Sequence, residues 1–428
     1  MSKQDFNKQV EKRQRIKKKT LIVGLDIGSE FNAMALMSKE GEIFGEYPKV
    51  YNSRQGFNYF VEIIEKMKAK KGLREVLIGL EPTGHYWRKI AFFAKERGYQ
   101  VQFIRTTALK HQRELDESSS AKSDKKDALT IGNITREGKY IDTVIADDIF
   151  RQLRTLSKVR EKVLRQSVSS QNTLSAVIDD YFPELKKIFS SMKIRSLWAL
   201  LKSAPFPQDV LKFKISTITE MLSKSSRRRS TAAQKARKLF EAAKESIGLK
   251  QVGEADRFRL TYFLEEVIRY EMRLKEITLQ MKRLLERVPC SQFLLSIPGV
   301  GPLSAAVFLG ELGNPEHFTH PKQNIKYSGY DPQERDSGNR IGRKMISKKG
   351  RWLLRKILFF MSMKVVQECD FFQEYYQRKL ENENRFGQRL KKKEAICAVT
   401  IKLIKVIFAL LRDKRRYDEQ APSIALAA

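Results

Sequence analysis

The chain has 428 residues, of which 41% are hydrophobic, and it carries 83 Lys and Arg against 50 Asp and Glu. This length exceeds what one compact core usually organises, and the apolar fraction excludes general disorder, so two or three domains are expected. The formal charge of +33 at pH 7 favours a polyanionic partner and predicts binding that depends strongly on salt. Because basic residues occur throughout the chain, nucleic acid fits better than a membrane surface.

Cysteine content and hydropathy exclude further classes. The three cysteines, Cys290, Cys369 and Cys397, are far apart and lack metal-ligand spacing, so neither a disulfide framework nor a zinc site is predicted. The first residues contain no apolar signal-peptide core, and the apolar stretch 396–411 is short and interrupted by two lysines. We therefore expect a cytoplasmic protein without a membrane partner.

A basic arm opens the chain. Residues 1–19 contain eight Lys and Arg against two acids, Asp5 and Glu11. Such a segment is usually disordered by itself, and it either settles on a phosphate backbone or stays a solvated tail. The sequence leaves these two interpretations open.

Strands alternate with helices across residues 20–145. Three early strands follow one another without room for helices, which predicts an antiparallel meander, and the later strand–helix–strand order predicts parallel additions to the same sheet. This order is that of an RNase H-like (RuvC-like) α/β domain. The expected strands are 21–26, 32–38, 42–50, 76–80 and 100–104, and the expected helices are 55–70 and 85–97.

Four carboxylates mark this domain as a candidate metal pocket. One apolar strand ends on Asp26 and another on Glu81, while Asp124 and Asp127 are three residues apart, on one face of a helix. Carboxylate oxygens are the ligands that Mg²⁺ prefers, and two ions would stabilise the attacking and leaving oxygens of a phosphodiester. Four clustered acids without metal would repel one another. The alternative for the helical pair is a solvated helix start, because two lysines lie between its acids.

The segment Gly24–Gly28 also resembles the first phosphate loop of actin-like sugar kinases and chaperone ATPases. Those proteins need a second, duplicated lobe with its own glycine-rich loops, and no segment of this sequence matches one. We therefore rank the kinase hypothesis below the metal-pocket hypothesis.

Residues 146–290 change to a helical pattern. Apolar residues recur at steps of four and three between 263 and 288, with charged residues between them, which predicts a coiled-coil seam, and 149–178 shows a patchier version. Two interpretations are open: long helices packed within one subunit, or helices that pair with another copy, which we favour. An insert near 185–250 interrupts the pattern. Three arginines of this insert predict an exposed basic segment that binds nucleic acid: Arg227, Arg228 and Arg229.

A mainly helical C-terminal domain is expected over 291–415, followed by a tail at 416–428. It begins with two short helices joined by a turn that contains Gly299 and Gly301. This pattern predicts a helix-hairpin-helix, whose exposed backbone N–H groups can receive a DNA phosphate. The alternative is an ordinary glycine-rich connection between helices. Helices are expected at 303–312, 350–368, 371–384 and 392–412.

Four motifs occur in one order: Gly24-Leu25-Asp26, Glu81-Pro82-Thr83-Gly84, Lys122-Ser123-Asp124-Lys125-Lys126-Asp127-Ala128 and Ile297-Pro298-Gly299-Val300-Gly301. With them the chain, from about residue 20 to 412, resembles the IS110 family of insertion-sequence transposases, which carry a DEDD motif. The resemblance implies a RuvC-like domain, a coiled coil and a C-terminal transposase domain. It also implies that Mg²⁺, as two ions per site, is held by Asp26, Glu81, Asp124 and Asp127.

The family carries a catalytic serine shortly after the helix-hairpin-helix and before a basic Ser-Lys-x-Gly segment. The corresponding residue is Ser337, with Ser347 as the second choice and Ser328 as the third; without the resemblance, Ser337 belongs to an ordinary turn. A serine hydroxyl is a weak nucleophile until it is deprotonated or polarised, which a metal held by the acids would achieve. Basic residues nearby would neutralise the phosphate: Arg340, Arg343, Lys344 and Lys348.

The resemblance implies partners as well. The acidic domain of one subunit would meet the serine domain of another, in a dimer or a tetramer of two dimers that aligns donor and target DNA. A structured non-coding guide RNA, the bridge RNA, would pair with both DNAs, so that base pairing selects the sequence. The expected function is an RNA-guided DNA transposase or recombinase of a bacterial nucleoid.

Two rival functions stay open. One is a RuvC-like junction resolvase that uses metal-activated water, and the other is a non-catalytic scaffold that binds nucleic acid. The long basic arm and the insert depart from the compact family pattern, which leaves the RNA contacts and the coiled-coil geometry open.

Overall fold

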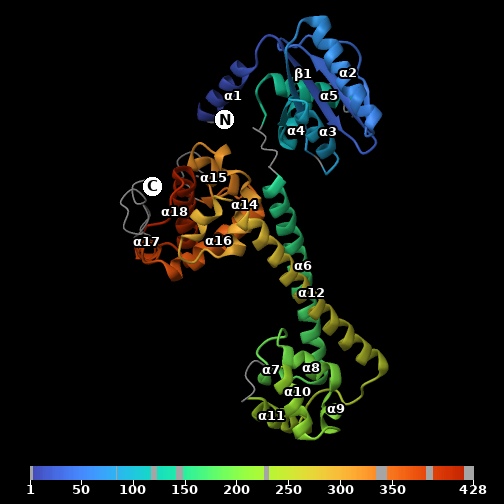
Figure 1. The fold of residues 1–428 in the computed structure, drawn as a ribbon, viewed down its shortest axis with the longest axis vertical. Coiled ribbons are helices and arrows are strands. Elements are labelled where there is room, and N and C mark those ends of the chain that lie inside the picture. The colour runs from blue at the N-terminus through green and yellow to red at the C-terminus, as the bar shows by residue number, and fades with distance from the viewer. Residues whose placement is uncertain are drawn as a thin grey trace. The chain divides into compact units, whose positions relative to one another are not determined.

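The computed structural model describes residues 3–82, 84–116, 123–140, 148–225, 231–333, 345–381 and 389–418. The chain divides into two compact units, residues 1–145 and 146–428. Each unit has its own hydrophobic core, a sheet-based core in the first and helical cores in the second (Figure 1).

A five-stranded sheet forms the centre of the first unit. Its strands lie in the order β3-β2-β1-β4-β5, in which β3, β2 and β1 are antiparallel and β4 and β5 are parallel to β1. This is the mixed order predicted for an RNase H-like α/β domain. The strands are β1 Thr20–Ile27, β2 Phe31–Met37, β3 Lys49–Tyr51, β4 Glu75–Leu80 and β5 Gln100–Phe103.

The predicted strand at 42–50 is wrong over most of its length. Only Lys49–Tyr51 joins the sheet as β3, and Ile43 makes an isolated bridge to Met37. Gly41 and Gly45 adopt positive φ angles of 103° and 71°, conformations that turn the chain instead of extending it. The apolar residues of this segment therefore cover a sheet edge without forming a long strand.

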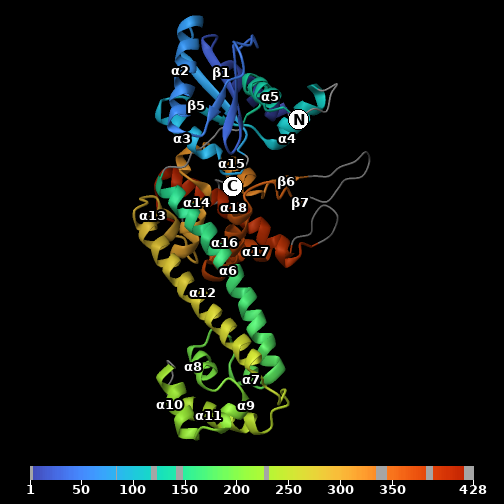
Figure 2. The same cartoon turned by 90° about the vertical axis from the view of Figure 1, so that its right-hand side faces the viewer.

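Helices cover both faces of the sheet because side chains alternate along each strand. Leu21, Val23 and Leu25 of β1 pack on one face with α2 (Arg54–Lys71) and α3 (Trp87–Glu96). Ile22 of β1 belongs to the opposite face, against which α5 (Asp124–Arg136) packs (Figure 2). The short helix α4 (Thr106–Asp116) contacts α5.

The basic arm, expected to be disordered by itself, forms a helix over most of its length, α1 (Lys3–Arg15). Gln9 donates a hydrogen bond to the carbonyl oxygen of Glu137 (3.3 Å), and Lys12 donates one to the carbonyl oxygen of Tyr140 (2.8 Å). The Lys12 ammonium also lies 4.9 Å from the centroid of the Tyr140 ring. These contacts hold the helix against the chain just after α5, where the sequence alone predicted no docking site.

Two long helices dominate the second unit: α6 (Asp148–Tyr181) and α12 (Glu254–Glu286), which pack along each other in one chain. Their mutual packing accounts for the apolar seam of α12, so the interpretation of two long helices within one subunit holds for this seam. Val267, Leu274, Ile277 and Met281 of this seam are buried, and Leu260 and Leu264 of α12 belong to the core of the insert.

The insert forms a small helical body around its own core, at one end of the α6–α12 pair (Figure 1). Its helices are α7 (Leu185–Ile188), α8 (Arg195–Ser203), α9 (Pro207–Leu211), α10 (Ile215–Ser225) and α11 (Ala232–Lys244). The predicted basic residues Arg227, Arg228 and Arg229 lie outside the described residues.

The remaining helices share one core with α14 (Pro302–Leu312), which is buried from Ala305 to Leu312. They are α13 (Ser291–Leu295), α15 (Pro321–Ser328), α16 (Trp352–Glu368), α17 (Asp370–Glu381) and α18 (Lys392–Asp413), with a 3₁₀ turn, η2, at Pro315–His317. A two-stranded ladder joins β6 (Pro332–Gln333) and β7 (Met345–Ile346). In the described part of the chain, every helix is too short or too polar to cross a membrane.

Candidate active site

Two glycines bring α5 into backbone contact with the sheet. Gly24 of β1 and Gly79 of β4 are neighbours in the parallel register. A Cβ atom at Gly24 would lie 2.0 Å from the carbonyl oxygen of Ala128, and one at Gly79 would lie 1.8 Å from Oγ1 of Thr135. Any larger residue at either position would push the helix away, since real side-chain carbons do not approach other atoms so closely.

This contact places the acids of the two strands and the helix on one side of the sheet. Asp26 follows Gly24 by two residues and therefore shares its face, and Glu81 stands in the same relation to Gly79. Ala128 packs with Ala33 of β2, and Ala33 is the register partner of Asp26. Asp127 directly precedes Ala128 in the helix and is 3% exposed. Its backbone therefore lies beside the end of β1.

The four predicted metal ligands differ in burial. Asp127 is buried, Asp26 and Glu81 are half-buried, and Asp124 is exposed at the first residue of α5. Among the described residues, no three His, Cys, Asp or Glu side chains are close enough together to hold a metal ion. The backbone therefore brings the acids to one face, while their side chains do not form a closed ligand cluster. Their all-oxygen donor set matches what Mg²⁺ requires.

Two asparagines that the sequence interpretation missed fix the chain just beyond Asp26. Asn52 donates to the carbonyl oxygens of Gly28 (3.0 Å) and Ser29 (2.9 Å), and Asn32, which is fully buried, donates to Oδ1 of Asn52 (3.0 Å). Buried amides are retained when their hydrogen bonds define a unique turn. The sequence signal that could have identified this contact is Asn32, a polar residue within an otherwise apolar strand.

The same turn explains the glycines of the phosphate-loop hypothesis. A Cβ atom at Gly28 would lie 2.3 Å from the carbonyl oxygen of Phe31, and Gly24 is needed for the contact with α5. Both glycines thus have packing reasons that involve no nucleotide. The kinase hypothesis gains no support from this segment.

The predicted nucleophile, Ser337, and three of its predicted basic neighbours, Arg340, Arg343 and Lys344, lie outside the described residues. The two ends of their segment are described. Pro332 pairs with Ile346 in the β6–β7 ladder, so the described residues that flank this segment lie side by side. The fourth basic residue, Lys348, is exposed and has a φ of 54°.

The other two serine candidates have defined surroundings. Ser328 is fully buried, and its hydroxyl donates to the carbonyl oxygen of Ile325 (2.9 Å). A buried hydroxyl of this kind cannot reach a phosphodiester, so the third-ranked candidate is wrong. Ser347 is half-buried, and its Oγ lies 3.4 Å from the carbonyl oxygen of Gly329.

A buried charge cluster supports the base of the serine segment. Glu311 of α14 is 2% exposed and lies 3.7 Å from both Arg154 of α6 and Arg351, the residue before α16. Arg351 also donates to the carbonyl oxygen of Glu311 (2.7 Å), and its guanidinium carbon lies 4.7 Å from the ring centroid of Tyr327. Burial lowers the pKa of Arg351 and raises that of Tyr327. The cluster ties four elements together next to the β6–β7 ladder.

The glycine turn predicted as a helix-hairpin-helix joins α13 to α14. Gly299 has a φ of 86°, and a Cβ atom there would lie 2.9 Å from the backbone of Lys364 in α16. Within the described residues, and apart from its chain neighbours, no atom lies within 4 Å of the Cβ position at Gly301. Packing explains the first glycine, and only the second stands next to open space. Phosphate binding by this turn stays a prediction.

Known proteins resemble the chain over both units. Residues 23–183 match a family model described as a transposase, that of the DEDD transposases of IS110, and residues 291–377 match the model of the transposase IS116/IS110/IS902 family. The 43.6 kDa protein of insertion element IS110 from Streptomyces coelicolor is 23% identical over 378 residues, which cover 86% of this chain and 89% of that protein.

Two further relatives cover less of the chain. The 44.8 kDa protein of insertion element IS116 from Streptomyces clavuligerus is 22% identical, over 70% of this chain and 74% of its own length. The mini-circle candidate transposase of IS117 from Streptomyces coelicolor is 22% identical, over 76% of this chain and 80% of its own length. The chain therefore belongs to the IS110 family of transposases: it is a DNA recombination enzyme with an RNase H-like α/β domain of the DEDD type, which indicates dependence on a divalent metal.

Proposed function

We propose that this transposase cleaves and rejoins DNA through Ser337, with Mg²⁺ held by the four acids and with a structured RNA as guide. The observation that carries the proposal is the glycine-mediated contact of α5 with β1 and β4. It brings the backbones of Asp26, Glu81 and Asp127 to one face of the sheet. A structural domain without chemistry has no need to gather acids there, because like charges repel.

The acids have distinct tasks in this proposal. Asp127 and Asp26 would be the fixed ligands, because helix and strand backbone hold them, and Glu81 and Asp124 would complete the set. When bound, the metal supplies Lewis acidity that stabilises negative charge on the attacking and leaving oxygens. The hydrogen bond between Asn32 and Asn52 (3.0 Å) would keep the turn after Asp26 in place when the acids bind the metal.

Ser337 is the best nucleophile among the three serines. Ser328 is buried, and Ser347 lies on the β7 side of the ladder beside the carbonyl oxygen of Gly329. The hydroxyl oxygen of Ser337 would attack phosphorus, forming a phosphoserine bond and releasing a 3′ hydroxyl; reversal on a second DNA strand would rejoin it. Basic side chains would neutralise the phosphate as charge develops: Arg340, Arg343, Lys344 and Lys348.

A composite site between subunits completes the proposal. The acids and the serine belong to different units of the chain, so a dimer, or a tetramer of two dimers, would bring the acids of one copy to the serine of another. The charge of +33 suits a protein that holds two polyanions, the DNA and a guide RNA, through their backbones.

The test is a covalent intermediate. Purified protein with its copurified RNA, donor DNA, target DNA and Mg²⁺ should give a protein–DNA adduct that resists denaturation. Ser337→Ala should abolish the adduct, whereas Ser347→Ala, the matched control, should retain it. Adduct formation that survives Ser337→Ala would reject this nucleophile.

Other outcomes separate the rival functions. Cleavage without any protein-linked DNA would favour a resolvase that uses water. Absence of cleavage by the unmodified protein under these conditions would favour a scaffold. Removal of Mg²⁺ with EDTA should stop cleavage, and its return should restore it.

A further inference from the structure

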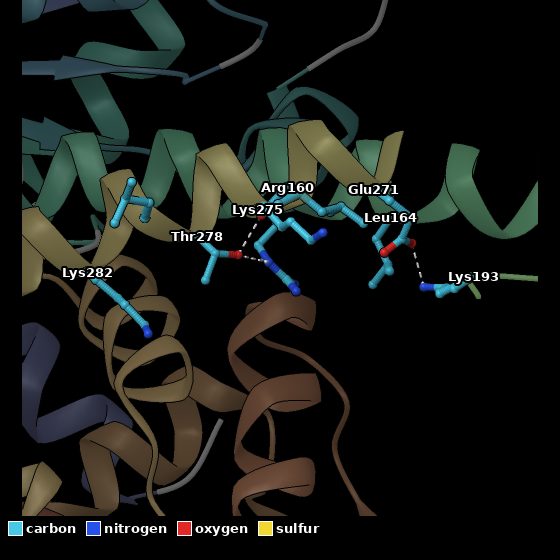
Figure 3. A pocket seen from close by; sticks show the side chains of 9 residues that line it. Arg160, Leu164, Lys193, Glu271, Lys275, Thr278 and Lys282 are labelled. Atoms are coloured by element: carbon cyan, nitrogen blue, oxygen red, sulfur yellow. Dashed lines mark hydrogen bonds and ion pairs between the residues drawn. The ribbon is translucent and has the colours of Figure 1, made fainter. Parts of the chain in front are cut away.

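A shallow groove lies between α6 and α12 in the second unit (Figure 3). Its volume is about 460 Å³, and residues of both helices line it, together with Lys193 of the insert. Four of its nine lining side chains are cationic and only one is a carboxylate. The lining residues are Arg160, Leu164, Lys193, Glu271, Leu274, Lys275, Thr278, Leu279 and Lys282.

The single carboxylate of the groove already has two partners within the protein. Glu271 forms an ion pair with Lys193 (2.6 Å) and accepts a hydrogen bond from the hydroxyl of Ser167 (3.3 Å). Within the described residues, the structure records no ion pair for the other three cations of the groove. This leaves an excess of three positive charges in one small concave surface: Arg160, Lys275 and Lys282.

Arg160 is oriented for a second acceptor. Its Nε donates to Oγ1 of Thr278 (3.4 Å), whose hydroxyl in turn donates to the carbonyl oxygen of Leu274 (2.6 Å). Figure 3 shows the Arg160 head beside Thr278. The two terminal NH₂ groups of the guanidinium point beyond this contact, in the fork geometry that suits a phosphate. Burial lowers the pKa of Arg160, which means that an anion here would stabilise its charge.

The spacing of the lysines fits a polyanion better than a single ion. Lys275 and Lys282 are seven residues apart on α12, about 10 Å along the helix axis. Along the axis of a duplex, this length corresponds to the rise of roughly three nucleotides of one strand. A second groove, of about 420 Å³ between the same helices, is also lined by cations, Arg151 and Arg283, and by no carboxylate.

We propose that the groove between α6 and α12 is a binding site for the phosphodiester backbone of nucleic acid, with Arg160 as the bidentate phosphate ligand and Lys275 and Lys282 beside it. This inference rests on the proposed function for the identity of its nucleic acids, DNA and guide RNA. What this inference adds is the location of the binding site. The site lies on α6 and α12, which are separate in the sequence from the four acids and from the serine segment.

The experiment measures binding and not catalysis. Full-length protein freed of copurified RNA is titrated into a fluorescent DNA duplex and, separately, a fluorescent RNA hairpin, over a series of KCl concentrations. The variant Arg160→Gln/Lys275→Gln/Lys282→Gln should bind more weakly, and the slope of log K against log salt should shrink by about two to three on at least one probe. A matched control removes three charges from paired cations outside the groove: Arg259→Gln/Arg273→Gln/Lys224→Gln.

Each outcome decides the question. Loss of slope with the RNA probe alone assigns the groove to RNA, and loss with the duplex alone assigns it to DNA. Equal slopes for the groove variant and the unmodified protein on both probes would overturn the proposal. Because Lys275 and Lys282 are exposed, the double variant Lys275→Gln/Lys282→Gln should keep the melting temperature and lose a slope of about one to two. The adduct assay for Ser337 is separate, so failure of one proposal does not imply failure of the other.

Discussion

The α-carbon of Gly24 lies in direct contact with the backbone of Ala128, because a Cβ atom at residue 24 would come within 2.0 Å of the Ala128 carbonyl oxygen. Two residues beyond the glycine is one predicted metal ligand, Asp26, and one residue before the alanine is another, Asp127. The distance between strand and helix therefore sets the distance between the two carboxylates. This coupling makes a packing residue decisive for chemistry.

Gly24→Ala should destabilise the first unit and disable the site together. The added methyl group forces α5 away from β1, at a cost of about 1–3 kcal/mol in the free energy of unfolding. Urea denaturation followed by circular dichroism measures the stability, and the adduct assay measures the activity. Gly301→Ala is the control, because no atom of another described residue beyond its chain neighbours lies within 4 Å of its Cβ position. A loss of stability as large as that of Gly24→Ala would contradict the packing argument.

Gly79→Ala should be partly rescued by Thr135→Ala. The Cβ atom at residue 79 would meet Oγ1 of Thr135 at 1.8 Å but Cβ of the same residue at 3.0 Å. Thr135→Ala removes Oγ1 and also Cγ2, which would lie at 3.2 Å, so only the contact with Cβ of Thr135 remains. A double-mutant cycle on the free energy of unfolding should give a favourable coupling of about 0.5–3 kcal/mol. Simple additivity would mean that the two residues do not touch.

Asp127→Asn should separate metal binding from folding. Without metal, the variant should be as stable as the unmodified protein or slightly more so, because one buried negative charge is gone. Mg²⁺ or Mn²⁺ should raise the melting temperature of the unmodified protein and leave the variant unchanged. Glu30→Gln, an exposed acid in the turn after β1, is the control and should keep the metal response. An equal metal response in both variants would argue against Asp127 as a ligand.

Glu311→Gln should destabilise the second unit by about 3–5 kcal/mol. The change removes the carboxylate that lies 3.7 Å from both Arg154 and Arg351 and leaves two guanidinium groups close together. Chemical denaturation measures the loss, and adduct formation should fall because the base of the serine segment loosens. The exposed acid Glu316 provides the control Glu316→Gln, which should change stability by less than about 0.5 kcal/mol.

Asp209 should give the insert a dependence on acid pH. Arg257 donates two hydrogen bonds to this carboxylate (2.8 and 3.1 Å), and Lys212 donates a third (3.1 Å). Burial by itself raises the pKa of Asp209, but these hydrogen bonds outweigh it and hold the pKa below its usual value. The carboxylate therefore stabilises the fold above its unfolded pKa of about 3.9, and this stability is lost as pH falls through the folded pKa.

Asp209→Asn should lower the free energy of unfolding by about 1–3 kcal/mol at neutral pH. The difference from the unmodified protein should shrink as the solution is acidified below about pH 4. Urea denaturation across this range tests both statements. The exposed pair of Glu220 and Lys224 supplies the control Glu220→Gln, which should lower the free energy of unfolding less than Asp209→Asn, because solvent screens an exposed ion pair. A difference that stays constant into acid would assign the stability to packing instead of charge.

Local pattern was enough for most elements of this fold. Short apolar runs predicted β1 and β4, strand-rich patterns predicted β2 and β5, and the four- and three-residue steps predicted α12, because burial leaves its pattern in the sequence. The failure at 42–50 is instructive in the same terms. That segment has apolar residues, but Gly41 and Gly45 turn the backbone, and β3 is confined to Lys49–Tyr51.

The sequence by itself determined which residues carry charge and chemistry: the four acids, the serine candidates and the cationic character of the whole chain. Tertiary structure decided what no local pattern contains. It showed that α5 packs directly on Gly24 and Gly79 and that Ser328 is buried. It also showed that the apolar seam of α12 packs against α6 of the same chain. The physical reason is that side-chain chemistry is a property of one residue, whereas burial and close approach depend on partners that are distant in the sequence.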